Sequence, residues 1–560
     1  EGATNASANG KIVLTFDEKV KLTGNAAATL GTQKIEGAVS GKTITFAYKG
    51  LNYATAYTFT LAAGSVADLT DNATDQAIVL NFTTKTKPAV TKALYDFIVP
   101  TDGDFKAALA AAAKRTDTSK RFRIFIKQGD YKIPADEKSK VTGSDGKSYA
   151  NPTTYMNTPN VSIIGEGMDN TSLTNTVPNS GQSANVLEGI GKGDVLCLQK
   201  GATNTYFQDL KMYSSMGDAK GRDIVLNDQS NKTICKNVNL WAYQDTYVSN
   251  NQNGKFYFED GILRGRTDYL CGKGDVYYNN VELWICEKGG YLAVPSQPKK
   301  YGYIFKDCTI KDATAAKDLN GNYTLGRPWG KGTPIALYID TKMEAIPSAA
   351  GWNEMSGGYP KRFAEYNSYT STGSVVDLKD RKKVYDAYDS KDGDNYVNRR
   401  NETAGDPILT AEEAATYTIE TVMGQDDDWD PTAATEQASA PSNVKLNGTT
   451  LAWDNNDYAL LWAVCKNGKV VDFTVEPTYN VDDASATWSV RAANEMGGLG
   501  EATEATTSTG IENITTSADV LSTKIYSADG VQVSKLQKGI NIVEKTMSDG
   551  SKKTSKIIIK

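Results

Sequence analysis

Three short stretches of the chain carry most of the side chains that could do chemistry. They are Tyr243–Thr246 (Tyr-Gln-Asp-Thr), Asp268–Gly272 (Asp-Tyr-Leu-Cys-Gly) and Leu325–Gly330 (Leu-Gly-Arg-Pro-Trp-Gly). Together they supply two carboxylates, a side-chain amide, a guanidinium and an indole. The chain contains no histidine, so acid–base or nucleophilic chemistry must use carboxylates, lysine, tyrosine or cysteine. A pair of aspartates held by glutamine and arginine is the simplest candidate.

A sequence repeat predicts how these stretches are positioned. Five segments share an aromatic residue or cysteine, followed two residues later by aspartate or asparagine. They begin at Phe207, Cys235, Phe258, Tyr278 and Phe305, so successive copies are 28, 23, 20 and 27 residues apart. One coil of a parallel β-helix has roughly this length, and such coils stack to bury a continuous core. The recurring aspartate or asparagine suits a left-handed turn that stacks from coil to coil.

The repeat also places two carboxylates near each other. Asp245 and Asp268 are 23 residues apart, which equals the offset between Cys235 and Phe258. Adjacent coils are about 4.8 Å apart, so we expect both carboxylates on one face, with one of them protonated because close carboxylates resist ionising together. Such a pair can act in acyl transfer, act as the acid and base of a glycosidase, or bind a cation. Both aspartates can also be mere turn residues.

The rest of the chain predicts an all-β protein with several domains. Residues 1–87 alternate apolar and polar residues as strands do, and resemble a bacterial Ig-like β-sandwich. Residues 88–430 form the predicted β-helix domain. Within it a helix is expected over 103–115, with one apolar face that covers the open end of the coils; that face carries Phe105, Ala108, Leu109 and Ala112.

Composition changes after residue 430. An acidic stretch is followed by a small-residue linker over 432–441. Residues 441–508 resemble a fibronectin type III-like sandwich through Leu451–Trp453 and Trp488–Asn494. Residues 510–560 contain short strands with Asp529-Gly530 as a turn signal, and resemble the C-terminal β modules of secreted Bacteroidetes proteins, which implies a secretion or sorting tail.

Charge and cysteine usage exclude several classes of protein. A net charge of −6 argues against nucleic-acid binding. No run approaches the ~18 apolar residues of a membrane span. The six cysteines lack metal-ligand spacing, and with no histidine available we expect no metal and buried cysteines. The chain starts at Glu1, which we interpret as a processed start of a secreted, cell-surface or periplasmic protein.

The motifs, in order, resemble those of the pectin methylesterases (pectinesterases, carbohydrate esterase family 8). The resemblance covers about residues 94–425 and is carried by Val161–Gly167, Tyr243–Thr246, Asp268–Gly272, Leu325–Trp329 and Phe363–Tyr366. It implies a right-handed parallel β-helix that removes methyl esters from polygalacturonate without a metal or cofactor. The expected partner is a methyl-esterified homogalacturonan chain, and the expected oligomeric state is a monomer.

The resemblance also implies roles for individual residues. Asp268 is the nucleophile that attacks the ester carbonyl, and Asp245 is the acid that protonates methanol and then the base for water. Gln244 donates to the oxyanion. Arg327 holds Asp268 ionised and oriented. Trp329 offers a flat face to a sugar ring.

Further residues are expected at the substrate, and two motifs depart from the family pattern. Tyr243 and Tyr269 are candidates for lining subsites. Counting back one coil from Gln244 gives Arg222, where the family has a second oxyanion-donating glutamine; Arg222 can donate there or instead pair with an aspartate and disable the oxyanion hole. The family favours Phe-Ile-Phe after the nucleophile, where this chain has Tyr269-Leu-Cys.

The sequence therefore predicts a carboxylic ester hydrolase, a pectinesterase, on a β-helix flanked by β-sandwiches. Two alternatives stay open. One is a β-helix glycosidase of the polygalacturonase type, which also uses paired aspartates. The other is a catalytically inactive surface protein that binds pectin, an alternative that the arginine at position 222 keeps open.

Overall fold

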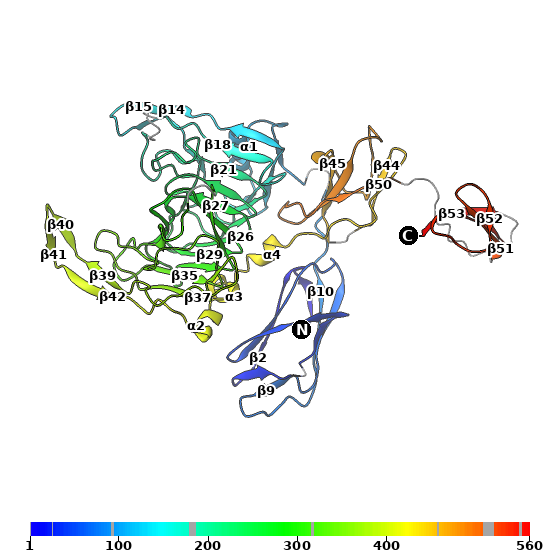
Figure 1. The fold of residues 1–560 in the computed structure, drawn as a ribbon, viewed down its shortest axis with the longest axis horizontal. Coiled ribbons are helices and arrows are strands. Elements are labelled where there is room, and N and C mark those ends of the chain that lie inside the picture. The colour runs from blue at the N-terminus through cyan, green and yellow to red at the C-terminus, as the bar shows by residue number, and fades with distance from the viewer. Residues whose placement is uncertain are drawn as a thin grey trace.

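Three long parallel sheets form the largest part of the protein, seen on the left in Figure 1. The computed structural model describes residues 2–24, 26–90, 94–178, 186–314, 318–455, 458–507, 520–547 and 552–559. The chain passes from the first sheet to the second and the third and then returns to the first, and each strand pairs with the strand one coil later. This architecture is a parallel β-helix in a nearly all-β chain, as the repeat predicted.

Strands that are neighbours within a sheet come from successive coils. The first sheet contains β11 (Phe97–Val99), β12 (Phe122–Ile126), β17 (Val161–Gly165), β20 (Tyr206–Gln208), β23 (Thr233–Lys236), β26 (Lys255–Glu259), β29 (Asp275–Asn279), β32 (Tyr303–Lys306), β35 (Ile335–Ile339) and β37 (Arg362–Tyr366). The second contains β13 (Gly129–Lys132), β18 (Thr171–Thr174), β21 (Lys211–Tyr213), β24 (Asn239–Trp241), β27 (Ile262–Gly265), β30 (Glu282–Ile285), β33 (Thr309–Asp312), β36 (Lys342–Met343) and β38 (Tyr369–Thr370). The third contains β16 (Thr154–Met156), β19 (Leu196–Leu198), β22 (Leu226–Asp228), β25 (Tyr247–Ser249), β28 (Thr267–Gly272), β31 (Gly290–Pro295) and β34 (Tyr323–Gly326).

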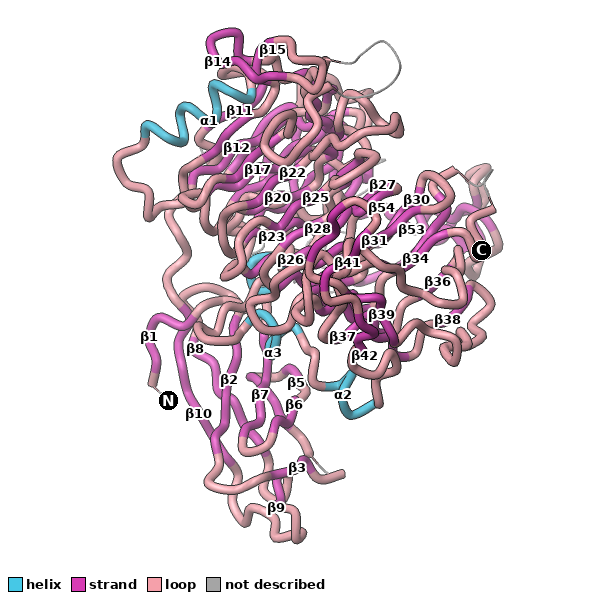
Figure 2. Tube along the Cα trace, turned by 90° about the vertical axis from the view of Figure 1, so that its left-hand side faces the viewer, coloured by secondary structure: helices cyan, strands magenta, loops and turns pink. Residues whose placement is uncertain are grey.

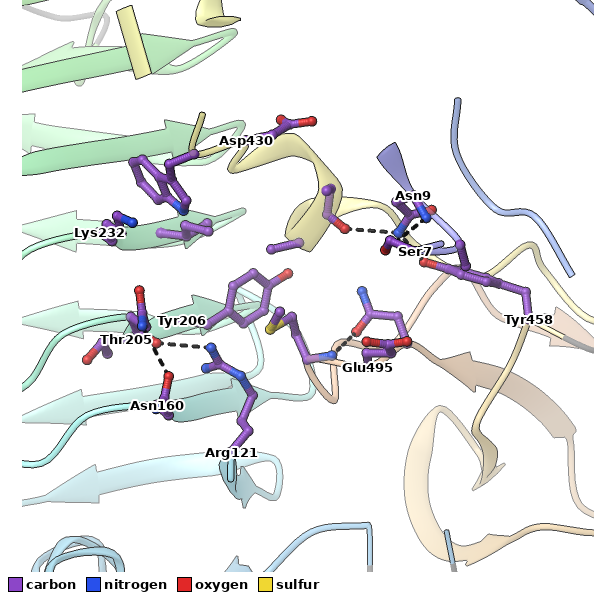
Figure 3. A pocket seen from close by; sticks show the side chains of 18 residues that line it. Ser7, Asn9, Arg121, Asn160, Thr205, Tyr206, Lys232, Asp430, Tyr458 and Glu495 are labelled. Atoms are coloured by element: carbon purple, nitrogen blue, oxygen red, sulfur yellow. Dashed lines mark hydrogen bonds between the residues drawn. The ribbon is translucent and has the colours of Figure 1, made fainter. Parts of the chain in front are cut away.

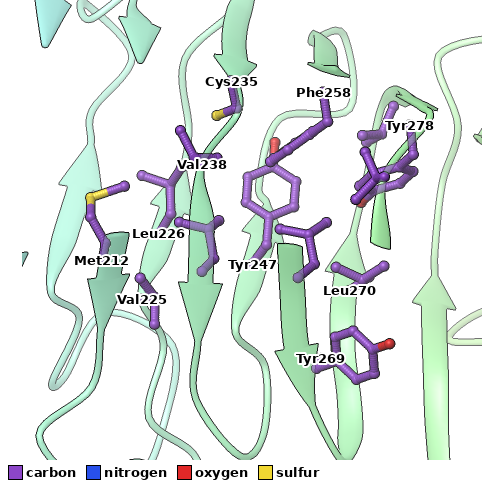
Figure 4. Packing of buried hydrophobic residues seen from close by; sticks show 14 of the residues in the cluster. Met212, Val225, Leu226, Cys235, Val238, Tyr247, Phe258, Tyr269, Leu270 and Tyr278 are labelled. Atoms are coloured by element: carbon purple, nitrogen blue, oxygen red, sulfur yellow. The ribbon is translucent and has the colours of Figure 1, made fainter. Parts of the chain in front are cut away.

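The predicted repeat is in register along the first sheet. Phe207 pairs with Cys235, Cys235 with Phe258, Phe258 with Tyr278 and Tyr278 with Phe305. The rings of Phe258, Tyr278 and Phe305 stack, with centroids 5.1 and 4.6 Å apart. Figure 4 shows Phe258 and Tyr278 among the buried side chains between the sheets. The first position of the repeat is therefore a core position.

Left-handed turns follow these first-sheet strands, as the repeat predicted. Asp209, Asn237, Asp260, Asn280 and Asp307 all have φ between 48° and 58°. Neighbouring turns are joined by side chains, because Asn237 Nδ2 donates to Asp209 Oδ1 at 2.6 Å and Asn280 Nδ2 donates to Asp260 Oδ1 at 2.7 Å. Aspartate and asparagine tolerate this conformation and bond locally, which explains their recurrence.

Helix α1 (Phe105–Lys114) begins after Asp104, whose side chain accepts a hydrogen bond from the Ala107 backbone N–H. Its buried residues are the predicted Phe105, Ala108, Leu109 and Ala112, and they belong to the core of the β-helix. The helix packs against β11, an edge strand of the first sheet. It therefore covers the apolar end of the first coil, as expected.

The N-terminal domain is a small sandwich with its own core, which includes Ile44, Phe46 and Phe59. Its strands are β1 (Ala3–Ala6), β10 (Ile78–Thr84), β8 (Ala56–Leu61), β4 (Ala28–Leu30) and β5 (Gln33–Ile35) in one sheet, β2 (Gly10–Thr15), β7 (Thr43–Tyr48) and β6 (Gly37–Ser40) in a second, and β3 (Val20–Leu22) with β9 (Val66–Asp68). Figure 2 shows this domain as a separate lobe below the β-helix.

The chain after residue 440 forms two further β units. The first has two four-stranded sheets: β43 (Lys445–Asn447), β44 (Thr450–Ala452), β47 (Thr478–Asn480) and β50 (Thr506–Thr507) in one, and β45 (Leu461–Lys466), β46 (Lys469–Thr474), β48 (Trp488–Ala493) and β49 (Thr503–Glu504) in the other. The second unit contains β51 (Val520–Ser527), β52 (Gln532–Val533), β53 (Gly539–Met547) and β54 (Lys552–Ile559).

The first of these units is docked on the β-helix. Phe473 packs against Tyr95 and Phe125, with ring centroids 4.8 and 5.2 Å apart. The Tyr95 hydroxyl donates to the Gly497 carbonyl at 2.7 Å, and Arg123 donates twice to the Glu495 carbonyl. Part of the outward face of the first sheet is therefore buried beneath a neighbouring domain.

Residues 404–440 differ from the prediction. Only the helix at 103–115 was expected, whereas the chain also forms α2 (Ala411–Ala415), α3 (Ile419–Met423) and α4 (Thr432–Thr435). These helices have four or five residues, too few for an apolar period to show in the sequence. The segment is not a free linker, because the Lys255 side chain donates to the Met423 carbonyl at 2.8 Å and the Gln425 carbonyl at 3.0 Å.

Two antiparallel elements project from the coils: β14 (Asp136–Thr142) with β15 (Ser148–Asn151), and the hairpin strands β39 (Val384–Ala387), β40 (Ser390–Asp392), β41 (Asn395–Val397) and β42 (Arg400–Thr403). In the part of the chain that the structure describes, no helix is long and apolar enough to cross a membrane. All six cysteines are buried and free, as expected for small apolar core residues.

Candidate active site

The predicted catalytic stretches meet along the third sheet, where two of them stack as left-handed turns at or just before its strands. Backbone bridges join Arg222 to Gln244 and Gln244 to Thr267, so the gap-free count back to Arg222 gives its true neighbour. Asp245 and Asp268 follow in the next position, with φ values of 57° and 51°. Both residues are 5% exposed. The two aspartates therefore occupy the same left-handed position on adjacent coils.

Asp268 is held by a two-pronged ion pair. Arg327 follows β34 and donates from Nε to Asp268 Oδ1 at 2.9 Å and from Nη2 to Oδ2 at 2.5 Å. The guanidinium carbon lies 4.0 Å from the centre of the Tyr291 ring. A bidentate pair of this kind fixes the orientation of the carboxylate, and the tyrosine face supports the cation from outside.

Asp245 has a different environment. Burial raises the pKa of this carboxyl to about 7, the nearby Arg222 guanidinium opposes the rise, and the charge of Asp268 adds to it. The Arg222 Nε lies 2.6 Å from Asp245 Oδ2, and the Arg222 side chain is 42% exposed. Two neighbouring carboxyls with environments that separate their protonation are the arrangement expected of an acid–base residue beside a nucleophile.

A third buried carboxyl lies beside these two and was not predicted. Asp223 is 1% exposed, and its Oδ1 accepts hydrogen bonds from the backbone N–H groups of Tyr243 and Gln244 at 3.3 and 3.4 Å. Burial raises its pKa well above the usual value, a rise that hydrogen bonds from Ser214 and these two N–H groups oppose. The sequence signal that could have identified Asp223 is its position directly after Arg222. Asp223 thus supports the backbone that carries Gln244.

The aspartates open into a small cavity of about 130 Å³. Its walls are Ile190, Arg222, Asp245, Asp268, Cys271, Val294, Trp329 and Met355. Trp329 is 40% exposed in the loop after β34. The volume is well below the roughly 300 Å³ at which pockets begin to enclose whole ligands. The cavity therefore has room for a reacting group, while the rest of a long substrate lies outside.

One wall of this cavity is apolar and was not predicted in full. Ile190 and Met355 come from loops, and they pack against Cys271 and Val294 of the third sheet. Burial raises the pKa of the Cys271 thiol well above its usual value, so this cysteine is protonated and unreactive. No sequence repeat marks Ile190 or Met355, because both lie outside the coil strands.

Three of the predicted site residues, unlike the aspartates and Trp329, do not line the cavity. Tyr269 is fully buried in the β-helix core (Figure 4), so its assignment to the substrate surface is wrong. The left-handed turn at Asp268 and the register shift after Thr267 direct the next side chain inward. Tyr243 is 5% exposed and its hydroxyl donates to Glu287 at 3.0 Å, away from the cavity walls. Gln244 is partly buried, and it is not among the residues that line the cavity.

Family comparisons match two parts of the chain. A pectinesterase family model matches residues 96–401, which is more than half of the chain, and a bacterial Ig-like domain model matches residues 1–84. The N-terminal sandwich is therefore a bacterial Ig-like domain. The matched pectinesterase region contains both aspartates, Gln244, Arg327 and Trp329.

Individual relatives agree at lower coverage. Pectinesterase 1 of Solanum lycopersicum is 23% identical over 291 residues, covering 50% of this chain and 48% of that protein. A pectinesterase/pectinesterase inhibitor of Arabidopsis thaliana is 22% identical over 314 residues, covering 53% and 51%. The chain thus spans about half the length of the curated relatives it matches.

Solved structures of pectin methylesterases match a somewhat larger share of this chain, and almost the whole of their own chains. A pectin methylesterase from carrot has a TM-score of 0.43 at 16% identity, covering 60% of this chain and 95% of that one. The pectin methylesterase PemA from Erwinia chrysanthemi has a TM-score of 0.42 at 19% identity, covering 61% and 99%. The family match over residues 96–401 shows that this chain belongs to the pectinesterase family.

Proposed function

We propose that the protein hydrolyses the methyl esters of polygalacturonate and releases pectate and methanol. The observation that carries this proposal is the unequal aspartate pair. Asp268 is fixed by two hydrogen bonds from Arg327, while burial raises the pKa of Asp245 to about 7. An ester hydrolysis through a covalent intermediate needs one such nucleophile and one such acid.

In the first step, a carboxylate oxygen of Asp268 attacks the ester carbonyl carbon. The tetrahedral oxyanion accepts a hydrogen bond from the side-chain amide of Gln244, an interaction worth roughly 3 kcal/mol in comparable sites. The bond from carbon to the methoxy oxygen then breaks, and the proton of Asp245 passes to that oxygen. Methanol leaves, and the galacturonate acyl group remains bonded to Asp268.

In the second step, Asp245 is anionic and acts as the base. It takes a proton from a water molecule, whose oxygen attacks the acyl carbon. The bond from that carbon to Asp268 breaks, which frees the galacturonate and restores the Asp268 carboxylate. Asp245 is protonated again, so the cycle closes without a metal or cofactor.

Arg222 affects both steps through Asp245. Its Nε lies 2.6 Å from Asp245 Oδ2 and favours the anion, which helps the second step and opposes the first. Arg222 thus occupies the place at which an additional oxyanion donor was expected, but its guanidinium forms an ion pair with Asp245, the proposed acid. We infer that Gln244 is the principal oxyanion donor and that Arg222 tunes Asp245.

Trp329 is proposed to contact the sugar ring next to the reacting group. Its indole is 40% exposed at the mouth of the cavity, where a flat ring face can pack against a pyranose. The apolar wall with Met355 and Ile190 excludes water from the ester methyl group. Tyr291, behind Arg327, positions the ion pair and does not touch substrate.

The flanking units suit a protein that works outside the cell on a polysaccharide. We propose a secreted or surface-located monomer, since cell-wall pectin is extracellular. The two four-stranded sheets within 441–508 support the fibronectin type III-like assignment, and the four-stranded unit after residue 520 supports the C-terminal module of the kind seen in Bacteroidetes. The domain limits 1–87, 88–430, 441–508 and 510–560 are proposed on the same grounds.

The test is methanol release from highly methylated pectin by the full chain, beside the Asp268→Asn variant. The expected result is release that falls by at least about a thousandfold in the variant, because no nucleophile remains. New reducing ends without methanol would instead indicate the glycosidase alternative. Neither product, together with retained pectin binding, would indicate the inactive binding protein.

A further inference from the structure

A second cavity, of about 290 Å³, lies where four parts of the chain meet (Figure 3). The β-helix forms one wall, the segment with α4 and a loop at 494–496 form others, and residues 7–9 of the Ig-like domain close it. We call it the junction pocket. It lies at the turns that precede the first sheet, whereas the catalytic cavity lies at the turns that precede the third. The two cavities have no lining residue in common, so they are separate sites.

A column of polar side chains forms the β-helix wall of the junction pocket. Strand register places Arg121, Asn160, Asn204 and Lys232 at the same position on four successive coils. Asn160, Asn204 and Lys232 have φ values of 55°, 58° and 62°, so the column is a second stack of left-handed turns. Neighbouring coils are about 4.8 Å apart, which places the two cations at opposite ends of one short column.

Arg121 has no acidic partner among the described residues. Its Nη1 donates to the Ser162 hydroxyl at 3.2 Å and its Nη2 to the Asn204 carbonyl at 3.1 Å, both neutral acceptors. Burial, with a smaller contribution from Arg123, lowers its pKa to about 10. Guanidinium groups that are taken out of water are normally paired with a carboxylate or phosphate. This one is prepared for an anion that the chain itself does not supply.

The lysine of the column is only partly neutralised. Lys232 lies 2.8 Å from Asp427, but that carboxylate also binds Lys255, so two lysines share one anion. The wall formed by the column therefore carries surplus positive charge.

The acidic residues that line the pocket are engaged elsewhere. The Glu495 carboxylate accepts hydrogen bonds from the Tyr53 hydroxyl at 2.7 Å and from Lys85 at 2.9 Å. Asp430 accepts at one oxygen from the Thr432 backbone N–H at 2.9 Å and from the Thr432 hydroxyl at 2.7 Å, in a turn just before α4. Neither carboxylate pairs with Arg121.

The remaining lining suits a sugar ring. Trp429 presents a partly buried indole, and Ala433 and Ala434 are small side chains beside it. Asn160 and Asn204 add amide groups in the same column as Arg121. An aromatic face, amides and one partly buried guanidinium without an acidic partner among the described residues are complementary to a ring that carries hydroxyls and a carboxylate.

We propose that the junction pocket is a non-catalytic binding site for one uronate unit of an acidic polysaccharide, with its carboxylate on Arg121 and its ring against Trp429. The volume of about 290 Å³ holds a single sugar ring and not a chain, so the unit is a chain end or a free sugar. The choice of galacturonate among the uronates rests on the proposed function, since that reaction exposes galacturonate carboxylates. The pocket itself requires only a carboxylate and a hydroxylated ring.

The experiment is calorimetric titration of the full chain with galacturonate, with galactose as the matched sugar that lacks the carboxylate. The wild-type chain is expected to bind galacturonate at least about tenfold more tightly than galactose. Arg121→Gln should weaken galacturonate binding at this site by at least about tenfold, because it removes a charge-assisted contact. Arg115→Gln is the control: Arg115 is a neighbouring arginine that donates to the Pro159 carbonyl outside the pocket, and its removal should leave binding within about twofold.

A second variant tests the pocket without removing Arg121, whose loss could by itself affect folding. Ala433→Leu adds volume inside the pocket at a helix position and removes no charge, and it should also lose the galacturonate site. Unfolding midpoints of all variants, measured without ligand, show that the comparison is made between folded proteins.

The proposal is overturned if wild-type chain binds no galacturonate, if galactose binds equally well, or if Arg121→Gln and Ala433→Leu leave the isotherm unchanged. Methanol release is measured on the same samples and should be unaffected by either substitution. Release without a galacturonate site in the pocket overturns this inference and leaves the proposed function standing. A site without methanol release supports the inference and counts against the proposed function.

Discussion

The Nε of Arg222 lies 2.6 Å from Oδ2 of Asp245, the carboxyl whose pKa burial raises to about 7. The arginine sits one coil before Gln244 and replaces an amide with a permanent charge. Because that charge favours the ionised carboxylate, Arg222 works against the burial that keeps Asp245 protonated. The balance between the two sets the pH range in which the proposed acid carries its proton.

The first prediction concerns the pH dependence of the wild-type enzyme. The first chemical step needs Asp245 protonated, and a group whose pKa is raised to about 7 loses its proton as pH rises through that value. We therefore expect kcat/KM for methylated pectin to fall above about pH 7. The measurement is kcat/KM from methanol release between about pH 4 and about pH 9. A rate that keeps rising through about pH 8 would contradict the assignment of Asp245 as the acid.

The second prediction concerns Arg222→Gln. Removing the cation removes the interaction that lowers the pKa of Asp245, so the pKa rises and the alkaline fall in kcat/KM moves to higher pH. We expect a displacement of about one pH unit, at the low end for charge pairs, because the arginine is 42% exposed. Arg222→Lys is the matched control that keeps the charge and should move the profile little. An unchanged profile in Arg222→Gln would show that the ion pair does not control Asp245.

The third prediction concerns Arg327→Lys. Lysine keeps the positive charge but cannot donate to both oxygens of Asp268 in a fixed plane. It also loses the stack on Tyr291, where the guanidinium carbon lies 4.0 Å from the ring centre. We expect kcat to fall by roughly a hundredfold with little change in KM, because the nucleophile loses its orientation. Steady-state kinetics on methylated pectin test this, and a fall confined to KM would argue that Arg327 binds substrate instead.

The fourth prediction separates the chemistry of Asp268 from its backbone. Asn and Asp tolerate the left-handed conformation at φ 51°, whereas alanine at such a position costs about 1 kcal/mol. Asp268→Asn and Asp268→Ala should both be inactive, but the alanine variant should unfold at a lower urea concentration. Both lose the ion pair to Arg327, but the asparagine oxygen can still accept a hydrogen bond from the guanidinium, so the difference reports the turn together with that hydrogen bond. Equal midpoints would mean that the turn contributes no strain.

Much of the fold follows from one repeat. The recurring aromatic or cysteine position predicted the strand register, and the recurring aspartate or asparagine predicted the left-handed turns, because both depend on local chemistry repeated every coil. The same register placed Asp245, Asp268 and Arg222 correctly, since equal offsets along a coil translate into neighbouring positions in space. The roles of these residues came from resemblance to a family and are proposals for the measurements above to decide.

Other features could not be predicted in this way. Tyr269 was assigned to the substrate because it follows the nucleophile, but the left-handed turn at Asp268 interrupts the alternation of a strand and sends the ring into the core. Ile190 and Met355 reach the cavity from loops that carry no period. The short helices α2, α3 and α4 have four or five residues, too few to show an apolar period. Helix α3 packs against β26 and β29, and α2 begins with a capping box formed by Thr410 and Glu413.

The catalytic coils lie in the middle of the β-helix. In the third sheet, β25 and β28 have β16, β19 and β22 on one side and β31 and β34 on the other. Stacked-repeat proteins open most readily from their ends, because a terminal coil has only one neighbour. Fraying at either end therefore leaves the two aspartates in place, and amide hydrogens around them should be among the slowest in the domain to exchange with solvent.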